Sequence, residues 1–404
     1  MRVKPWLVAA LILLPFVGGT FTVIYQNLTK GSTDLYPTWQ AAKLFWEDGI
    51  SPYAEIVGQK NQQAIYGRPA LPDEDQVLYA YPFYGIFHIG PLAFMSFRLA
   101  AAIYMEGLLL GLLLAMVLNL HILRWLPSPS VLSLLLLWTI IGYFSVRGML
   151  LGQPGLFVYV MRMIALWGIF RQRDSLAGAA LAVTMLKPQT GFLIIPLLLL
   201  WVWRVQRYRI IFSFIAVFML MIGLSFLLEP GWLADWLERT RSYTGYVETV
   251  PAAHILTHFS DSIPDSVANS AQVILSLLLL LPVFYFWQAR LWQGDNTQLL
   301  WGYCLTMTVT MLIAPRVATT SYIELYPVLY IIAYLMTQRR QTLWLLITGL
   351  AALIGYWVLH IATVPPAAEG AGKEAPIVYV VFPVFLLILL LYYREKFPEL
   401  NRGF

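Results

Sequence analysis

The sequence predicts an all-α polytopic membrane protein, on the evidence of its composition and of the distribution of its charges. Of its 404 residues, 59% are hydrophobic and only 12% are charged. Largely apolar runs of about eighteen residues or more recur from end to end, as expected of helices that cross a bilayer. No stretch has the composition of a separate soluble domain, so residues 1–404 are expected to form one integral membrane domain.

About twelve transmembrane helices are expected, with both termini in the cytoplasm. Basic residues cluster between alternate apolar segments, which accounts for the net charge of +5 without a nucleic-acid partner. The long acidic loops 26–82 and 229–267 are therefore expected outside the plasma membrane, where they would carry the functional site. The predicted spans are Trp6–Tyr25, Ala100–Ile122, Val131–Ser145, Gly155–Phe170, Leu176–Leu186, Phe192–Trp203, Ile210–Leu228, Ala268–Trp287, Gln298–Ile313, Tyr322–Met336, Leu343–His360 and Val378–Tyr392.

The first outer loop contains a segment with helical spacing that begins just after Asp34. Trp39 and Trp46 repeat along it, and tryptophan favours the membrane–water boundary, so this segment is predicted to be an interfacial helix. Asp34 has two interpretations: the N-cap of that helix, or a general base held at the membrane surface. Residue types alone favour the cap.

Two other apolar stretches depart from plain spans. Pro82–Phe97 is too short to cross comfortably and is predicted to be re-entrant or interfacial. The second stretch is interrupted in its middle by Lys187, Pro188 and Gln189, so two short helices are expected to meet there. A lysine at membrane depth is costly, and beside the free N–H groups of a new helix it predicts an anion site. The alternative is a lysine that snorkels to the interface.

Weaker signals follow at two outer turns. Gly152 and Gln153 form a turn with Arg147 one helical turn earlier, and Gln153 could orient a sugar hydroxyl. Arg316 is either a second phosphate ligand or a snorkelling interface arginine. Glu324 is expected to pair with an arginine, and Arg316 is the nearest along the chain.

Neither a metal site nor a cofactor is expected. The acidic triplet 73–75 lies among prolines and is typical of a solvated turn. His254 and His258 have the spacing of a zinc pair, but Ile255 stands where an HExxH motif has its glutamate. The single cysteine, Cys304, excludes a disulfide within one chain and a cysteine-ligated metal cluster.

Several short motifs occur in a fixed order: D-x-Y after the first span, G-x-x-P-Y, Y-P-F, G-Q and a membrane-embedded K-P-Q. In this order they resemble glycosyltransferase family 87, mannosyltransferase-like membrane enzymes of the GT-C superfamily, which usually have Y-P-P in place of Y-P-F. The resemblance is closest over the first half of the chain and implies a GT-C-like helical bundle. Its residues are Asp34, Tyr36, Gly49, Pro52, Tyr53, Tyr81, Pro82, Gly152, Gln153, Lys187, Pro188 and Gln189.

The resemblance implies an inverting glycosyltransferase without a cofactor. It would move a hexose, expected to be mannose, from a polyprenyl-phosphate donor to a glycolipid or glycan acceptor on the extracytoplasmic side. The first outer loop of such enzymes supplies the base, which favours catalysis over capping for Asp34. Many relatives carry a histidine where this chain has Thr319, Thr320 and Ser321, so the role of that histidine is not transferred. Expected substrate-binding residues are Lys187, Gln189, Arg316, Gln153, Tyr36, Tyr81 and Arg147.

Two other functions stay open. A transporter or flippase for a lipid-linked or anionic substrate would use the same buried lysine and broken helices as a path. It would normally show repeated halves, and it would gain nothing from an acid at the start of an interfacial helix. A non-catalytic scaffold would not need Lys187 at membrane depth.

Overall fold

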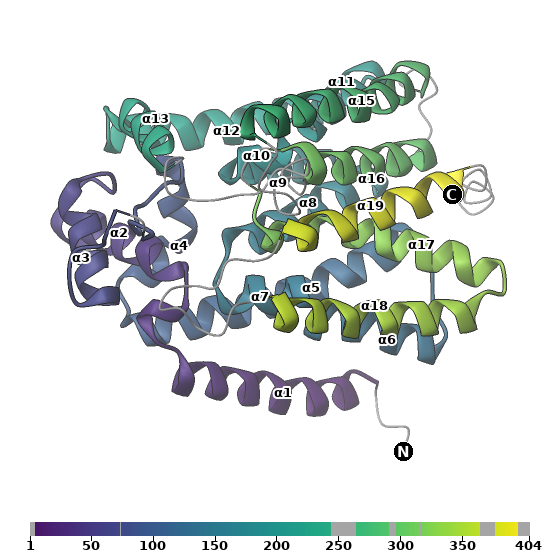
Figure 1. Ribbon diagram of the computed structural model, residues 1–404, viewed down its shortest axis with the longest axis horizontal. Coiled ribbons are helices and arrows are strands. Elements are labelled where there is room, and N and C mark those ends of the chain that lie inside the picture. Colours follow the sequence, from purple (N-terminus) through teal and green to yellow (C-terminus); the bar gives the residue numbers. More distant parts are fainter. Residues whose placement is uncertain are drawn as a thin grey trace. The chain divides into compact units, whose positions relative to one another are not determined.

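The computed structural model describes residues 5–72, 74–243, 264–290, 296–314, 317–363 and 376–394. Within these ranges every regular element is an α- or 3-10 helix, which confirms the all-α prediction for this part of the chain (Figure 1). Asp73, His254, His258 and Arg316 lie outside the described residues. The chain divides into two compact units, each described here by itself. Unit 1 comprises Met1–Gly111, Gly148–Pro154 and Met221–Val247, and unit 2 comprises Leu112–Arg147, Gly155–Leu220 and Glu248–Phe404.

The described helices follow the predicted apolar segments closely in position but less closely in length. In chain order they are α1 (Pro5–Asn27), η1 (Lys30–Ser32), α2 (Leu35–Asp48), α3 (Glu55–Tyr66), η2 (Phe83–Gly85), α4 (Ile86–Ala93), α5 (Phe97–Ile122), α6 (Pro129–Ile141), α7 (Tyr143–Leu150), α8 (Pro154–Phe170), α9 (Asp174–Val183), η3 (Thr184–Leu186), α10 (Pro188–Gly191), α11 (Ile194–Arg204), α12 (Tyr208–Leu228), α13 (Trp232–Tyr243), α15 (Asp265–Arg290), α16 (Asn296–Ile313), η5 (Thr319–Leu325), α17 (Tyr326–Gln338), α18 (Thr342–Thr363) and α19 (Pro376–Tyr392).

Among the described residues, five helical segments are long and apolar enough to cross a membrane, and they identify the chain as a membrane protein. Several other predicted spans form apolar helices of only 10–17 residues, whereas a crossing takes about twenty. The prediction of about twelve transmembrane helices is therefore not confirmed. The five segments are Phe97–Ile122, Pro129–Leu150, Tyr208–Leu228, Ser266–Gln288 and Thr342–Thr363.

In unit 1, the segment predicted to be interfacial forms α2, which packs against α3 and α4 (Figure 1). Trp39 lies on its buried face and donates its indole N–H to the carbonyl of Leu92 at 3.1 Å, whereas Trp46 is exposed. The eight residues of α4 are too few to cross a bilayer, as expected for Pro82–Phe97. The position of α2 and α4 at a membrane surface stays a prediction.

The two long loops that are predicted to face outward contact each other within unit 1. The second loop begins with α13, which contacts η2 of the first loop. Trp236 on α13 donates its indole N–H to the carbonyl of Ala80 at 3.1 Å. One turn further, Arg239 donates to the carbonyl of Tyr53 at 2.6 Å. α13 therefore contacts the first loop both before Tyr81, at Ala80, and after it, at η2.

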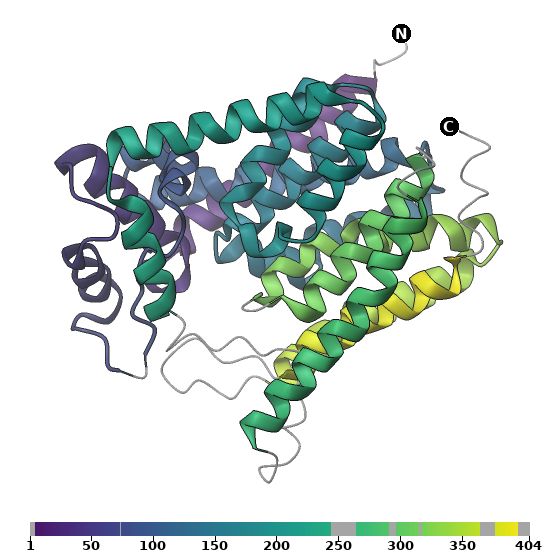
Figure 2. The ribbon, with the colours of Figure 1, turned by 90° about the horizontal axis from the view of Figure 1, so that it is seen from above.

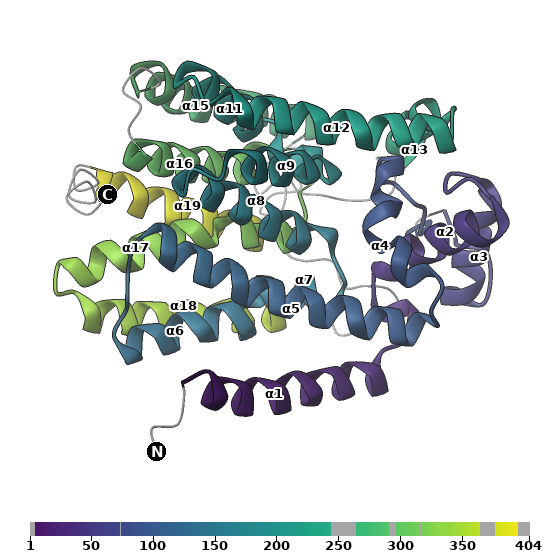
Figure 3. The ribbon, with the colours of Figure 1, turned by 180° about the vertical axis from the view of Figure 1, so that it is seen from behind.

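In unit 2, α16 lies at the centre and is buried along its length, including Cys304. It contacts α10, α11, α15, α17 and α19, and its largest contacts are with α15 and α19, the long green helix and the yellow helix of Figure 2. On the periphery, α6 and α18 pack side by side (Figure 3). Leu277 and Leu281 of α15 are exposed, as suits a helix that faces lipid.

Candidate functional site

In unit 1, Asp34 lies immediately before α2 with an exposed side chain. Its Oδ2 accepts a hydrogen bond from Nε2 of Gln153, and its side chain makes no capping hydrogen bond to the helix. The first turn is bonded by Thr33 instead, whose Oγ1 accepts from the N–H of Leu35 at 3.1 Å. Side-chain capping, the alternative that residue types favoured, is therefore wrong, because the neighbouring threonine supplies the oxygen.

A tight turn at Gly152 brings Gln153 to this acid. Thr33 Oγ1 donates to the carbonyl of Leu151 at 2.7 Å, which fastens the two segments together. Gly152 has φ +64°, and a Cβ built on it would lie 2.7 Å from the Cβ of Leu35. Only glycine combines the left-handed backbone with so close an approach. The D-x-Y and G-Q motifs, more than a hundred residues apart in sequence, thus form one polar cluster.

Two predicted substrate-binding tyrosines also belong to unit 1. Tyr81 is half-buried in the loop before η2; burial, and then the charge of Asp34, raises the pKa of Tyr81 above its ordinary value. Tyr81 therefore stays protonated and able to donate a hydrogen bond near the acid. Tyr36 is buried on α2, where its ring packs edge-on against Phe97 and its hydroxyl donates to Gln40 at 3.2 Å.

In unit 2, the chain breaks at Lys187 as expected. η3 ends at Leu186, Lys187 itself has non-helical angles, and α10 begins at Pro188. The side chain of Lys187 is buried, and its Nζ donates to Oγ of Ser321 at 3.0 Å. A snorkelling lysine would be exposed, so that alternative is not supported. Gln189 is half-buried on α10.

The expected helix N-terminus beside Lys187 is a poor anion site. α10 contains four residues, so too few aligned peptide dipoles are present to give it a substantial positive end. A helix does start beside Lys187 as expected, but Phe192 and Leu193 separate the short α10 from α11, and the anion site there stays a prediction. The case for anion binding in unit 2 consequently depends on side-chain charge.

A buried ion pair lies next to Lys187. Arg162 of α8 and Glu324 of η5 form an ion pair of 2.5 Å, with side chains 0% and 1% exposed. The prediction that Glu324 pairs with an arginine is therefore confirmed, with Arg162 of a different helix as a partner. Arg316, the candidate nearest along the chain, lies outside the described residues. Arg162 also donates to Oγ1 of Thr190 at 3.3 Å, and Thr190 donates to the carbonyl of Lys187 at 3.0 Å.

Arg147 takes part in a different contact of unit 2. It donates from its guanidinium to the hydroxyl of Tyr143 at 3.2 Å, and that hydroxyl is hydrogen-bonded to Nδ1 of His360 at 3.0 Å. Arg147 and Tyr143 lie on α7, and His360 lies near the end of α18. The hydroxyl of Tyr143 thus links α7 to α18 in unit 2.

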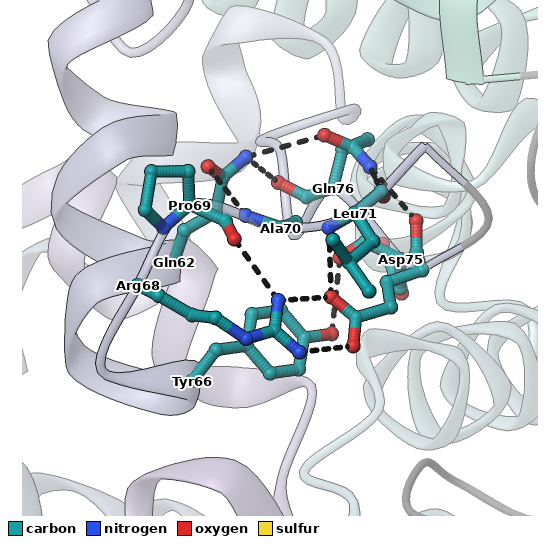
Figure 4. Close-up of polar contacts among 9 residues, drawn as sticks. Gln62, Tyr66, Arg68, Pro69, Ala70, Leu71, Asp75 and Gln76 are labelled. Atoms are coloured by element: carbon teal, nitrogen blue, oxygen red, sulfur yellow. Dashed lines mark hydrogen bonds and ion pairs between the residues drawn. The ribbon is translucent and has the colours of Figure 1, made fainter.

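The acidic stretch in the loop after α3 has a structural role. Arg68 donates two hydrogen bonds of 2.7 Å to the carboxylate of Glu74, and the N–H of Leu71 donates to the same group. Figure 4 shows these bonds closing the loop, with Gln62 and Gln76 on its other side. The Arg68 side chain, and then the Leu71 N–H, lowers the pKa of Glu74 to about 2. Within the described ranges, no group of three or more potential metal ligands is present.

The long apolar helices are those of a membrane protein, in which unit 1 carries an exposed acid, Asp34, and unit 2 carries buried charged side chains. The chain belongs to glycosyltransferase family 87, whose family model matches residues 79–315, more than half of its length. This confirms the resemblance, and family membership implies a glycosyltransferase. No curated protein and no solved structure matches the sequence.

The matched segment divides the candidate residues. It contains Tyr81, the Gly152–Gln153 turn and the Lys187–Gln189 break, whereas Asp34 and Tyr36 precede it. Asp34 is connected to the matched segment by its hydrogen bond with Gln153. Sequence reasoning missed Arg162, although a lone charge in the middle of a predicted span was the signal that could have found it.

Proposed function

We propose that the protein is an inverting glycosyltransferase that transfers a hexose, expected to be mannose, from a polyprenyl-phosphate donor to an extracytoplasmic or membrane-lipid acceptor. Family membership supports the transferase class. The observation that carries the proposal further is the side-chain contact of Asp34 with Gln153. A carboxylate whose side chain does not cap its helix and is oriented by an amide donor is suited to act as a base.

Asp34 takes the proton of the acceptor hydroxyl as that oxygen attacks the anomeric carbon. The attack inverts the carbon while the bond from the anomeric carbon to the phosphate oxygen breaks through an oxocarbenium-like state. The lipid phosphate leaves with the electron pair of that bond, and the proton stays on Asp34. Gln153 is a positioning residue, because its amide fixes how the carboxylate is turned.

Lys187 receives the negative charge of the lipid phosphate. A buried ammonium in a water-poor interior stabilises an anion more strongly than a surface lysine does, because the local dielectric is low. Its burial supports this role, and its bond to Ser321 orients the ammonium group. Other proposed substrate contacts are Gln189, Tyr36, Tyr81, Arg147 and Arg316.

The reaction is proposed to occur on the outer face of the plasma membrane, with both chain termini in the cytoplasm. The sidedness of the basic residues supports this orientation. In a background with Cys304→Ser, an impermeant thiol reagent should label Ser242→Cys in intact cells and leave Gln338→Cys unlabelled. The reverse pattern would place the loops in the cytoplasm and favour a nucleotide-sugar donor.

Purified protein in liposomes tests the function itself. Mannosyl polyprenyl phosphate with a radiolabelled sugar is supplied together with membrane lipid extract as the acceptor source. The label is expected to move to a new lipid or glycan with inverted anomeric configuration, and GDP-mannose should not replace the donor. Movement of intact donor across the bilayer without cleavage would instead support the transporter alternative and contradict the proposal.

A further inference from the structure

Tyr104 has a buried hydroxyl group that makes no hydrogen bond with the described residues of the protein. The residue is 8% exposed and lies on the part of α5 that belongs to unit 1. Burying a hydroxyl without a partner is unfavourable, so stability does not explain its presence. Other tyrosines of unit 1 donate their hydroxyl to a carbonyl or amide oxygen, namely Tyr36 at 3.2 Å, Tyr53 at 2.8 Å, Tyr66 at 3.0 Å and Tyr79 at 3.0 Å.

The side of α5 that carries Tyr104 packs against the helices next to the acid. Phe97 and Tyr104 are seven residues apart, close to two helical turns, so their side chains point to the same side of α5. The ring of Phe97 lies 4.9 Å from that of Tyr36, which follows Asp34 by two residues at the start of α2. The ring of Tyr104 lies 5.9 Å from that of His88 on α4, and α4 packs against α2. Tyr104 therefore faces the pair of helices that begins at Asp34.

Tyr81 connects the Tyr104 hydroxyl with the acid, because it interacts electrostatically with both Asp34 and Tyr104. Side chains hold the backbone around Tyr81 in place. The carbonyls of Ala80, Tyr81 and Pro82 accept hydrogen bonds from Trp236 at 3.1 Å, Tyr53 at 2.8 Å and Tyr79 at 3.0 Å. The Tyr81 side chain itself is half-buried, so its ring can turn while this backbone stays fixed.

We propose that Tyr104 is an acceptor-binding residue, whose hydroxyl forms a hydrogen bond with an oxygen of the acceptor. The inference rests on the proposed function and deepens it. Asp34, as the base, touches the attacking hydroxyl of the acceptor, so polar groups near Asp34 meet the acceptor. The Tyr81 ring turns aside, and the acceptor supplies the partner for the Tyr104 hydroxyl. The acceptor then has one oxygen that attacks and a second nearby oxygen that Tyr104 binds, as in a sugar but not in a simple lipid alcohol.

Tyr104→Phe tests this inference, because it removes the hydroxyl and keeps the ring. Transfer is measured with the full-length protein in liposomes, with radiolabelled mannosyl polyprenyl phosphate and increasing amounts of membrane lipid extract. The amount of extract that gives half-maximal transfer should rise by about tenfold, the effect of one lost hydrogen bond, while the half-saturating donor concentration stays the same. The melting temperature should not fall, because the hydroxyl bonds none of the described residues. Tyr66→Phe, which removes a hydroxyl bonded to the carbonyl of Asp75, is the control and should change neither concentration.

Each other outcome has a definite meaning. An unchanged requirement for extract in folded Tyr104→Phe protein would overturn the inference. A higher half-saturating donor concentration would assign Tyr104 to the donor, and a lower maximal rate alone would make it a positioning residue; either result overturns acceptor binding. Failure of Tyr104→Phe to fold would show that the hydroxyl supports the structure, which also contradicts the inference. If the wild type transfers no label, the proposed function itself is contradicted.

Discussion

Replacing Gly152 by alanine should separate Gln153 from Asp34. Gly152 has φ +64°, and an alanine in that conformation costs about 1–2 kcal/mol. Its Cβ would also lie 2.7 Å from the Cβ of Leu35, and relieving such an overlap costs about 1–3 kcal/mol. The Leu35 Cβ is fixed to the backbone of α2, so relief requires the two segments to move apart.

Gly49→Ala is the matched control. Gly49 has φ +67° at the end of α2, but nothing lies within 4 Å of its added Cβ. Gly49→Ala should therefore lower the free energy of unfolding only through the strained backbone conformation, by about 1–2 kcal/mol. Gly152→Ala should lower it by about 2–5 kcal/mol. Thermal unfolding in detergent compares their stabilities, and the initial rate of sugar transfer compares their activities.

The two variants should differ in both measurements. Gly152→Ala is expected to have the lower melting temperature and, at a temperature where it remains folded, a rate reduced by about tenfold or more, because the base is misplaced. Gly49→Ala should transfer sugar at nearly the normal rate. Equal melting temperatures and equal rates in the two variants would refute the close packing of the Gly152 turn against the start of α2.

Three further predictions concern single side chains. Gln153→Leu should lower turnover by about ten- to a hundredfold with little change in donor affinity, because only the orientation of Asp34 is lost; equal loss of affinity would argue for a direct substrate contact. Lys187→Met should weaken binding of the phosphate donor in a folded protein, whereas Lys187→Arg should retain part of it, as a titration with mannosyl farnesyl phosphate would reveal. The pKa of Glu74 is lowered from 4.5 to about 2, so Glu74 should hold its loop closed above about pH 4.5 and release it as the pH falls toward 2. Amide hydrogen exchange in the loop should then become faster, and Glu74→Gln should abolish that pH dependence.

Local features were predictable from sequence because their causes are local. The apolar spacing after Asp34 predicts α2, and a proline directly after Lys187 predicts the break at that residue. The lengths of the helices were not predictable in the same way. An apolar run sets where a helix can lie, but breaks such as the one between α10 and α11 depend on packing in unit 2.

Contacts between distant segments were the part that sequence could not supply. Asp34 and Gln153 are 119 positions apart, and only the folded turn at Gly152 brings them together. Nearness along the chain suggested only Arg316 as a candidate partner for Glu324, whereas Arg162, with which Glu324 forms an ion pair, comes from a separate helix. Sequence likewise could not show that Thr33, rather than the side chain of Asp34, accepts the hydrogen bond at the first turn of α2.

The central claim is that Asp34 is the base for sugar transfer, and Asp34→Asn tests it most directly. Asparagine keeps the size of the side chain and an oxygen that Gln153 can bond, but it cannot take a proton at neutral pH. Asp48→Asn, an exposed acid at the other end of α2, is the control. The account predicts that Asp34→Asn stays folded and binds donor while its single-turnover rate falls by at least about a hundredfold, with Asp48→Asn unaffected. A near-normal rate in folded Asp34→Asn protein would contradict it.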